Sequence, residues 1–552
     1  MKTSFEKNEN STATYYETID FYRLLAEKSD LIQLTEWGMT DQGKPLHEVV
    51  IDGLSRFDLP SGENDERTIL FINNAIHPGE PCGVDATMML ARDIASGKTE
   101  LPSDLTLVII PFYNIGGGLN RGSHSRANQL GPEAYGFRGN ARHLDLNRDF
   151  LKCDSRNAQS FNQLFNRWKP HVMIDNHTSN GADYQYVMTL IATQKDKLAP
   201  EVSKVMVEDM LPALYEDMKN KDYEMTPYVH ARNTPDEGIA GFLDYARYSS
   251  GYAALHHTIS FMPETHMLKP YRDRVYSTYG FMSSMIDYLR DEGETVRKAN
   301  IKAYENYCKR DRVPLDWQLD PSRIDSLLFK GYEARYKPSD VSGHSRLYYD
   351  HGSPYEKEIP FYNSYKPVLE VERPQAYVIP QAYHEVKDRL EWNGVQIDLL
   401  EKDTVMSVQA YYVVSFKDQP AYEGHYWHTD IKVKRVIQDI QFYAGDFIVK
   451  TDQASCRYIM ETLEPQAPDG FFAWNFFDGI LMQKEYFSPY VFEDLAAKII
   501  EENTNLRSKL EEKRQSDPEF AADGYAQLEF IYKNSPYYEE SHNRVPVYRV
   551  LE

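Results

Sequence analysis

The chain has 552 residues, which is too long for one typical core and predicts a large domain with at least one more. Hydrophobic residues make up 41% and aromatic residues 13% of the sequence, a composition that excludes a disordered chain. The formal net charge of −23 argues against nucleic acid or an anionic membrane as a partner, because phosphate groups would be repelled by the surface as a whole.

The sequence leaves the compartment open. Residues 1–11 are polar and charged, without the apolar core of a signal peptide. No run of 18 apolar residues occurs, so we expect a soluble protein that does not insert into membranes. A protein whose signal peptide has been removed would show the same sequence. We expect a secreted or periplasmic location if a signal peptide was removed, and a cytoplasmic location otherwise. The cysteines Cys82, Cys153, Cys308 and Cys456 are widely spaced, and we expect them to be free.

The first 295 residues alternate between helices and apolar strands. We expect helices at 15–29, 84–97, 157–168, 200–221 and 272–291, and strands at 31–34, 45–52, 67–76, 105–112, 170–177 and 255–264. This alternation is typical of an α/β domain, here with a mixed, mostly parallel sheet and helices on both faces. Functional residues of such sheets gather at strand ends.

The pattern of the sequence changes after residue 321. A charged helix is expected at 296–310 and a linker at 313–321. Short alternating apolar stretches then dominate, with a long helix at 489–513. We therefore predict a catalytic domain at 1–310 and a β-rich α+β accessory domain of unknown role at 321–552.

Three candidate metal ligands follow two of the predicted strands. His77 and Glu80 come directly after the strand at 67–76, and His177 ends the strand at 170–177. A catalytic zinc site uses three protein ligands of this kind and keeps one position open. Taken alone, a His-x-x-Glu pair is more often an ordinary turn.

Further motifs accompany these ligands in chain order. They are Asp145-x-Asn147-Arg148, His177-x-Ser179 and Glu264, the last at the end of an otherwise apolar strand. With this combination, residues 14–295 resemble the M14 zinc carboxypeptidases, the carboxypeptidase A-like family. The resemblance implies that fold, and one Zn2+ per chain held by His77, Glu80 and His177.

The resemblance also implies roles for other residues. Asp145 would accept a hydrogen bond from His77 and fix its tautomer. Glu264 would be the general base that takes a proton from the attacking water and passes it to the leaving amine. Arg138, seven residues before Asp145, would stabilise the oxyanion, with Arg142 as the reserve candidate.

The same resemblance assigns substrate binding to Asn147 and Arg148, because a guanidinium matches the two oxygens of a terminal carboxylate. The family usually carries a tyrosine ahead of the base on a loop over the substrate. Tyr245, Tyr248 and Tyr252 are all available, and Tyr248 is our choice.

The expected function is a zinc metallocarboxypeptidase that hydrolyses C-terminal peptide bonds. One alternative is a zinc amidase or deacylase acting on N-acyl amino acids or cell-wall peptides, and another is a non-catalytic module that binds carboxylates. The substrate is in each case a peptide or N-acyl amino acid with a free carboxylate. His425 and His428 are a weak candidate for a second metal site, since residues three apart do not share one face of a strand.

Overall fold

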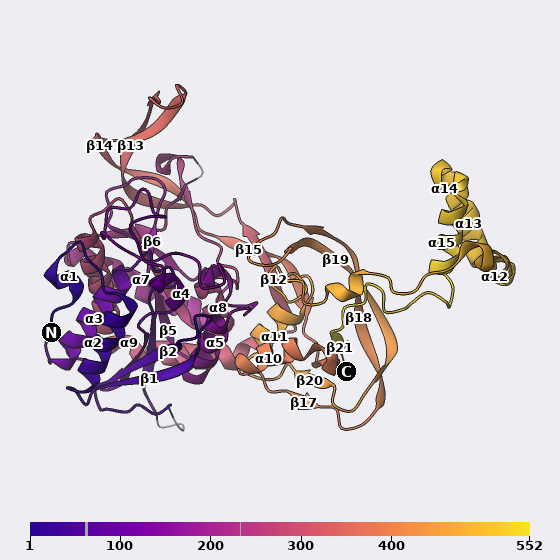
Figure 1. Ribbon diagram of the computed structural model, residues 1–552, viewed down its shortest axis with the longest axis horizontal. Coiled ribbons are helices and arrows are strands. Elements are labelled where there is room, and N and C mark those ends of the chain that lie inside the picture. The colour runs from indigo at the N-terminus through magenta and orange to yellow at the C-terminus, as the bar shows by residue number, and fades with distance from the viewer. Residues whose placement is uncertain (61–64, 232, 552) are drawn as a thin grey trace.

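The computed structural model describes residues 1–60, 65–231 and 233–551. Figure 1 shows a large α/β part, a β-rich part beside it, and a small group of helices set apart from both. Among the described residues, no helix has both the length and the apolar character that crossing a bilayer requires.

The described residues of the α/β part form a nine-stranded mixed sheet. Its order is β1 (Ile32–Met39), β2 (Pro45–Asp52), β4 (Leu105–Ile110), β3 (Thr68–Asn73), β5 (Val172–Asp175), β11 (Ile259–His266), β7 (Met188–Ala192) and β8 (Met225–Pro227), with β6 (His177–Ser179) paired to β11. The central strands β4, β3, β5 and β11 are parallel to one another. Each of them is buried on both faces, which explains why apolar residues predominate in β3, β4 and β5.

Helices cover both faces of this sheet, as predicted. They are α1 (Ser4–Lys7), α2 (Tyr15–Ala26), α3 (Cys82–Ala95), α4 (Ile115–Leu119), α5 (Arg156–Trp168), α6 (Pro200–Lys204), a π-helical turn at Val205–Met210, α7 (Leu211–Asn220), α8 (Ser249–Leu255) and α9 (Tyr271–Tyr307). On one face the ring of Phe71 contacts Phe161 and Phe165 of α5. On the other face Phe261 packs against Phe281 of α9.

Two predicted boundaries in this part are wrong. The strand expected from residue 255 begins at Ile259, because residues 249–255 form α8, and a short apolar run fits a buried helix as well as a strand. The helices expected at 272–291 and 296–310 are the single helix α9. Gly293 does not end it, since its missing side chain leaves room for Thr68 of β3.

The chain after α9 forms several smaller sheets. The predicted linker at 313–321 is instead mostly strand β12 (Arg312–Leu319), which pairs with β15 (Tyr365–Glu372). A long hairpin of β13 (Asp325–Pro338) and β14 (Ser345–Tyr362) returns to the α/β part, where it continues a small sheet with β10 (Ile239–Ala240) and β9 (His230–Ala231). The division of the chain near residue 320 stays a prediction.

The β-rich part is built on another sheet. Its order is β17 (Asp398–Leu399), β20 (Phe447–Lys450), β16 (Ala376–Ile379), β21 (Tyr548–Val550), β18 (Thr404–Asp418) and β19 (His428–Phe442), accompanied by α10 (His384–Trp392) and α11 (Cys456–Leu463). One continuous cluster of buried residues joins this part to the α/β part, from Phe5 to Val547. The two parts therefore share a hydrophobic core rather than merely touching.

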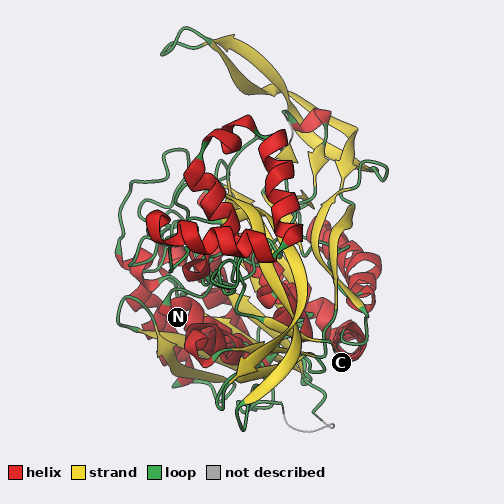
Figure 2. Cartoon of the chain, turned by 90° about the vertical axis from the view of Figure 1, so that its right-hand side faces the viewer, coloured by secondary structure: helices red, strands yellow, loops and turns green. Residues whose placement is uncertain are grey.

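The last helices form a separate small unit, seen at the right of Figure 1 and in front in Figure 2. They are α12 (Pro489–Glu502), α13 (Thr504–Ser516), α14 (Pro518–Ala522) and α15 (Gly524–Lys533), which enclose a hydrophobic cluster of their own. The single helix expected at 489–513 is interrupted at Asn503, whose side chain accepts a hydrogen bond from the backbone of Leu506 and so begins α13.

The expectation of four free cysteines is also wrong. Cys308, at the end of α9, forms a disulfide with Cys456, at the start of α11, with a Cα–Cα distance of 5.9 Å. Their sequence separation of 148 residues gives no sign of this proximity. Cys82 and Cys153 are free and buried.

Candidate active site

The candidate ligands meet at the carboxyl ends of three neighbouring strands. β3 ends at Asn73 and leads to His77 and Glu80, while β5 ends at Asp175 and leads to His177. Glu264 lies on β11, directly opposite His177 in the parallel pairing with β6. Parallel strands bring their carboxyl ends to one edge, and His77, Glu80, His177 and Glu264 gather at this edge.

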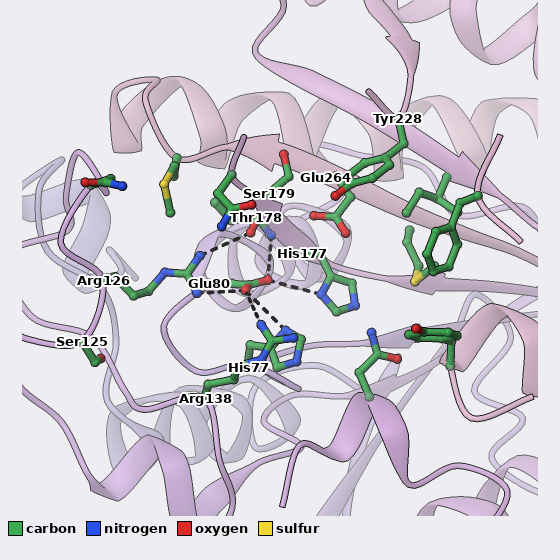
Figure 3. A pocket seen from close by; sticks show the side chains of 18 of the residues that line it. His77, Glu80, Ser125, Arg126, Arg138, His177, Thr178, Ser179, Tyr228 and Glu264 are labelled. Atoms are coloured by element: carbon green, nitrogen blue, oxygen red, sulfur yellow. Dashed lines mark hydrogen bonds and ion pairs between the residues drawn. The ribbon is translucent and has the colours of Figure 1, made fainter. Parts of the chain in front are cut away.

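His77, Glu80 and His177 form a compact buried cluster (Figure 3). One ligand atom of each lies within 4.8 Å of the others. The Nδ1 atoms of His77 and His177 are 3.3 and 3.2 Å from the two carboxylate oxygens of Glu80. Nδ1 of His77 has no hydrogen-bond partner among the described residues, although it is buried. Two imidazole nitrogens and a carboxylate directed at one point fit a zinc ion.

On the side of the ring away from the cluster, each histidine contacts a carboxylate. Nε2 of His77 is 2.8 Å from Asp145 Oδ1, and Nε2 of His177 is 3.0 Å from Asp175 Oδ2. Both rings therefore direct Nδ1 at the cluster. Burial alone would raise the pKa of Asp145, but His77, Arg138 and Arg148 hold it well below its usual range. Asp175 was not predicted; the only signal was a carboxylate two residues before His177 at the end of a strand.

Two arginines reach this cluster. Arg138 donates from Nε to Asp145 over 3.0 Å, and its Nη1 is 3.5 Å from Glu80. Its side chain is 44% exposed and lines the cavity. Arg142, the reserve candidate, instead donates to the backbone oxygen of Asp154 and does not line the cavity.

Arg126 is the second arginine, and sequence reasoning missed it. It donates from Nη1 to Glu80 over 2.9 Å and from Nη2 to the backbone oxygen of Thr178 over 3.3 Å. It comes from the long loop that follows α4, which also brings Ser125 and Asn128 to the cavity. The length and composition of this loop were the signal that could have directed attention to it.

Asn147 and Arg148 lie in a short 3₁₀ turn, Leu146–Arg148, and both line the cavity. The Arg148 guanidinium lies 4.5 Å from the centre of the Tyr248 ring. Tyr248 lines the cavity as well. Tyr245 and Tyr252 do not line it, since their hydroxyls contact Asp316 and Asn393. Of the three tyrosines considered, Tyr248 alone lines the cavity.

Glu264 opens onto the same cavity, which has a volume of about 510 Å³. Burial raises the pKa of Glu264 to about 7, and the nearby Glu80 carboxylate acts in the same direction. Figure 3 shows the Tyr228 side chain beside Glu264. Tyr228 also lines the cavity, and no motif indicated it.

His425 and His428 contact different carboxylates. His425 is 2.6 Å from Asp154, whereas His428 lies between Asp418 and Asp478. In the part of the chain that the structure describes, only His77, Glu80 and His177 form a cluster of metal-ligating side chains. The structure therefore gives no support to a second metal site at these histidines.

Comparisons with known proteins find carboxypeptidases among the similar chains. No family model matches the chain. Carboxypeptidase 2 of Trichophyton rubrum is 23% identical over 490 residues, which cover 84% of each chain. Carboxypeptidase 2 of Trichophyton tonsurans is 23% identical over 426 residues, covering 73% of this chain and 72% of the relative. Carboxypeptidase A from Helicoverpa armigera, a solved structure, aligns with a TM-score of 0.39 at 13% identity, over 53% of this chain and 75% of that chain.

The curated relatives match well beyond the α/β part, and the motifs of the cavity stand in the expected order along the chain. Together with the cluster of His77, Glu80 and His177, this similarity to curated carboxypeptidases supports the resemblance to the M14, carboxypeptidase A-like family.

Proposed function

We propose that the protein is a zinc metallocarboxypeptidase that removes single residues from the carboxyl ends of peptides. The observation that carries the proposal is a shared cavity: the His77, Glu80 and His177 cluster, the carboxylate of Glu264 and the guanidinium of Arg148 all line it. The names of the relatives, carboxypeptidase 2, support the same activity.

His77, Glu80 and His177 would hold the zinc ion, which when bound lowers the pKa of water and polarises a carbonyl group. Glu264 would accept the proton of the attacking water and deliver it to the leaving amine. A base with a pKa near 7 suits both transfers at neutral pH, and such catalysis contributes typically about 10²–10⁴-fold. Arg138, half exposed beside Glu80, would donate to the oxygen on which negative charge develops.

Arg148 and Asn147 would bind the terminal carboxylate of the peptide. The guanidinium of Arg148 presents parallel N–H donors, which match the two oxygens of a carboxylate. This is a local basic site in a chain of net charge −23. Restriction to the last peptide bond follows, because only a chain end offers that carboxylate.

Arg148→Ala tests whether the protein recognises the terminal carboxylate of a peptide. We expect it to reduce kcat/KM for peptides with a free carboxyl end by about 10²-fold, since a charge-assisted bidentate contact is lost, and to affect C-terminally amidated peptides far less. Arg142→Ala is the matched control, because that side chain lies outside the cavity. Equal losses on the acid and the amide would contradict the proposal and favour an amidase acting on N-acyl amino acids or cell-wall peptides.

A further inference from the structure

A hairpin tip of the β-rich part reaches the candidate active site. Strands β18 and β19 are joined by residues 419–427, whose tip is the turn Tyr422-Glu423-Gly424-His425. Tyr422 and His425 exchange two backbone hydrogen bonds, of 2.8 and 3.0 Å. Glu423 and Gly424 have φ values of 50° and 84°, so the tip is a tight turn of type I′ character. A turn this short holds its side chains in a fixed direction.

Aromatic packing fixes the hairpin further. The rings of Tyr422 and Trp427 both stack on Trp474, with centroid distances of 6.1 and 5.9 Å. The Arg247 guanidinium lies 4.1 Å from the centre of the Trp427 ring. His425 is bound to Asp154 on the α/β part. The tip is thus anchored on both sides of the boundary between the two parts.

This tip holds both ends of the segment that carries the proposed carboxylate site. The backbone N–H of Asp145 donates to Glu423 Oε2 over 2.8 Å, and Nε of Arg148 donates to the Tyr422 hydroxyl over 2.9 Å. Nη1 of Arg148 donates to the backbone oxygen of Asn147 over 2.7 Å. For Nη2 of Arg148, no acceptor is found among the described residues, and the side chain lines the cavity.

We propose that Tyr422 is a positioning residue for the carboxylate of the substrate, supplied by the accessory part of the chain. By accepting from Nε, it turns the guanidinium so that the Nη end faces the cavity. The accessory part is then a component of the substrate site and not only a stabilising appendage. This inference rests on the proposed function of Arg148.

The test compares Tyr422→Phe with Tyr426→Phe, each in zinc-loaded full-length protein. Tyr426 lies on the same hairpin but is 64% exposed, so it is the matched control. Glu264→Gln is added to every protein so that peptides are bound without being cleaved. Calorimetry then gives the Kd of an N-blocked dipeptide with a free carboxyl end and of its C-terminal amide.

We expect Tyr422→Phe to weaken binding of the free acid about ten-fold, the usual effect of losing one hydrogen bond to a charged group, and to leave the amide unchanged. Tyr426→Phe should change neither. In an Arg148→Ala background the effect of Tyr422→Phe should vanish, because the residue through which it acts is absent. A general loss of structure would weaken both peptides and lower the Tm.

Equal binding by the Tyr422→Phe and Tyr426→Phe variants, or equal losses on acid and amide, would overturn the inference. Peptide trimming by the protein without Glu264→Gln is measured in parallel and tests the proposed function separately. If the protein trims no peptide but Tyr422→Phe selectively weakens binding of the dipeptide with a free carboxyl end, the carboxypeptidase activity is refuted. The positioning role of Tyr422 would still stand. Absence of any carboxylate-dependent binding would refute both.

Discussion

Glu264 differs from the other carboxylates of the cavity in its surroundings. Glu80 contacts two histidines and Arg126, and Asp145 contacts His77 and Arg138. Among the described residues, the carboxylate of Glu264 has neither a hydrogen bond nor an ion pair, and it faces the cavity. A carboxylate in this state is available to accept a proton from a water molecule.

Glu264→Gln should therefore leave zinc binding intact and reduce kcat by about 10²–10⁴-fold, because the amide keeps the size of the side chain but cannot accept a proton. Metal content by mass spectrometry and single-turnover hydrolysis are the measurements. A variant with full metal content and undiminished kcat would eliminate Glu264 as the base.

Site residues that belong to short motifs could be predicted from the sequence, whereas partners brought in by folding could not. His77-x-x-Glu80 and Asp145-x-Asn147-Arg148 each encode a local geometry. Arg126 comes from a loop without a motif, and it meets Glu80 only through the fold of that loop. Tyr422 is 274 residues from Arg148, and only the three-dimensional structure brings them together.

At the scale of elements, α8 connects the sheet to the loop that carries Tyr248, its N-cap residue. A Cβ added to Gly251 in α8 would lie 2.0 Å from the backbone oxygen of Tyr245. Neither the Gly251 backbone nor the Tyr245 backbone can move without shifting α8 and the loop before it. Close packing of this helix against its own loop thus fixes where Tyr248 stands in the cavity.

Gly251→Ala should destabilise the protein by about 1–3 kcal/mol, the usual cost of overpacking, and should raise KM through displacement of Tyr248. Gly280→Ala in α9 is the control, since its Cβ would lie 3.6 Å from the flexible Met218 side chain. There the loss of glycine flexibility should be neutral or stabilising. Thermal unfolding and KM measure both effects; equal Tm values for the two variants would contradict this account of α8.

The elements that were predicted correctly have strong local patterns. The strand expected at 105–112 is apolar except for Thr106, and the helix expected at 84–97 is followed by Gly97, which has a φ of 72°. The expectation of a linker at 313–321 failed because Val313 and Trp317 are buried in a strand pair with β15, a contact made across some fifty residues. Pairing over such a separation leaves no local signal in the sequence.

On the scale of the whole molecule, the α/β and β-rich parts are joined by a shared core, the hairpin tip and the Cys308–Cys456 disulfide. The disulfide links α9 to α11 and closes a long loop of chain. Such a crosslink stabilises mainly by restricting the unfolded chain.

Cys308→Ser together with Cys456→Ser should lower the free energy of unfolding by about 2–4 kcal/mol, because the unfolded chain gains freedom. Denaturant unfolding of the double variant and the unchanged protein measures the difference. Thiol titration of the unfolded protein without reductant should find two free thiols, those of Cys82 and Cys153. Four thiols would contradict the crosslink.

The central claim is that a metal-dependent activity at the cavity removes residues from carboxyl ends. Its most direct test is digestion of a mixed peptide library, read by mass spectrometry before and after chelation, with zinc content measured on the same sample. We predict about one zinc per chain and loss of single C-terminal residues that stops when the metal is removed. Trimming that persists without metal, or a zinc-loaded protein that trims no carboxyl end, would contradict the claim.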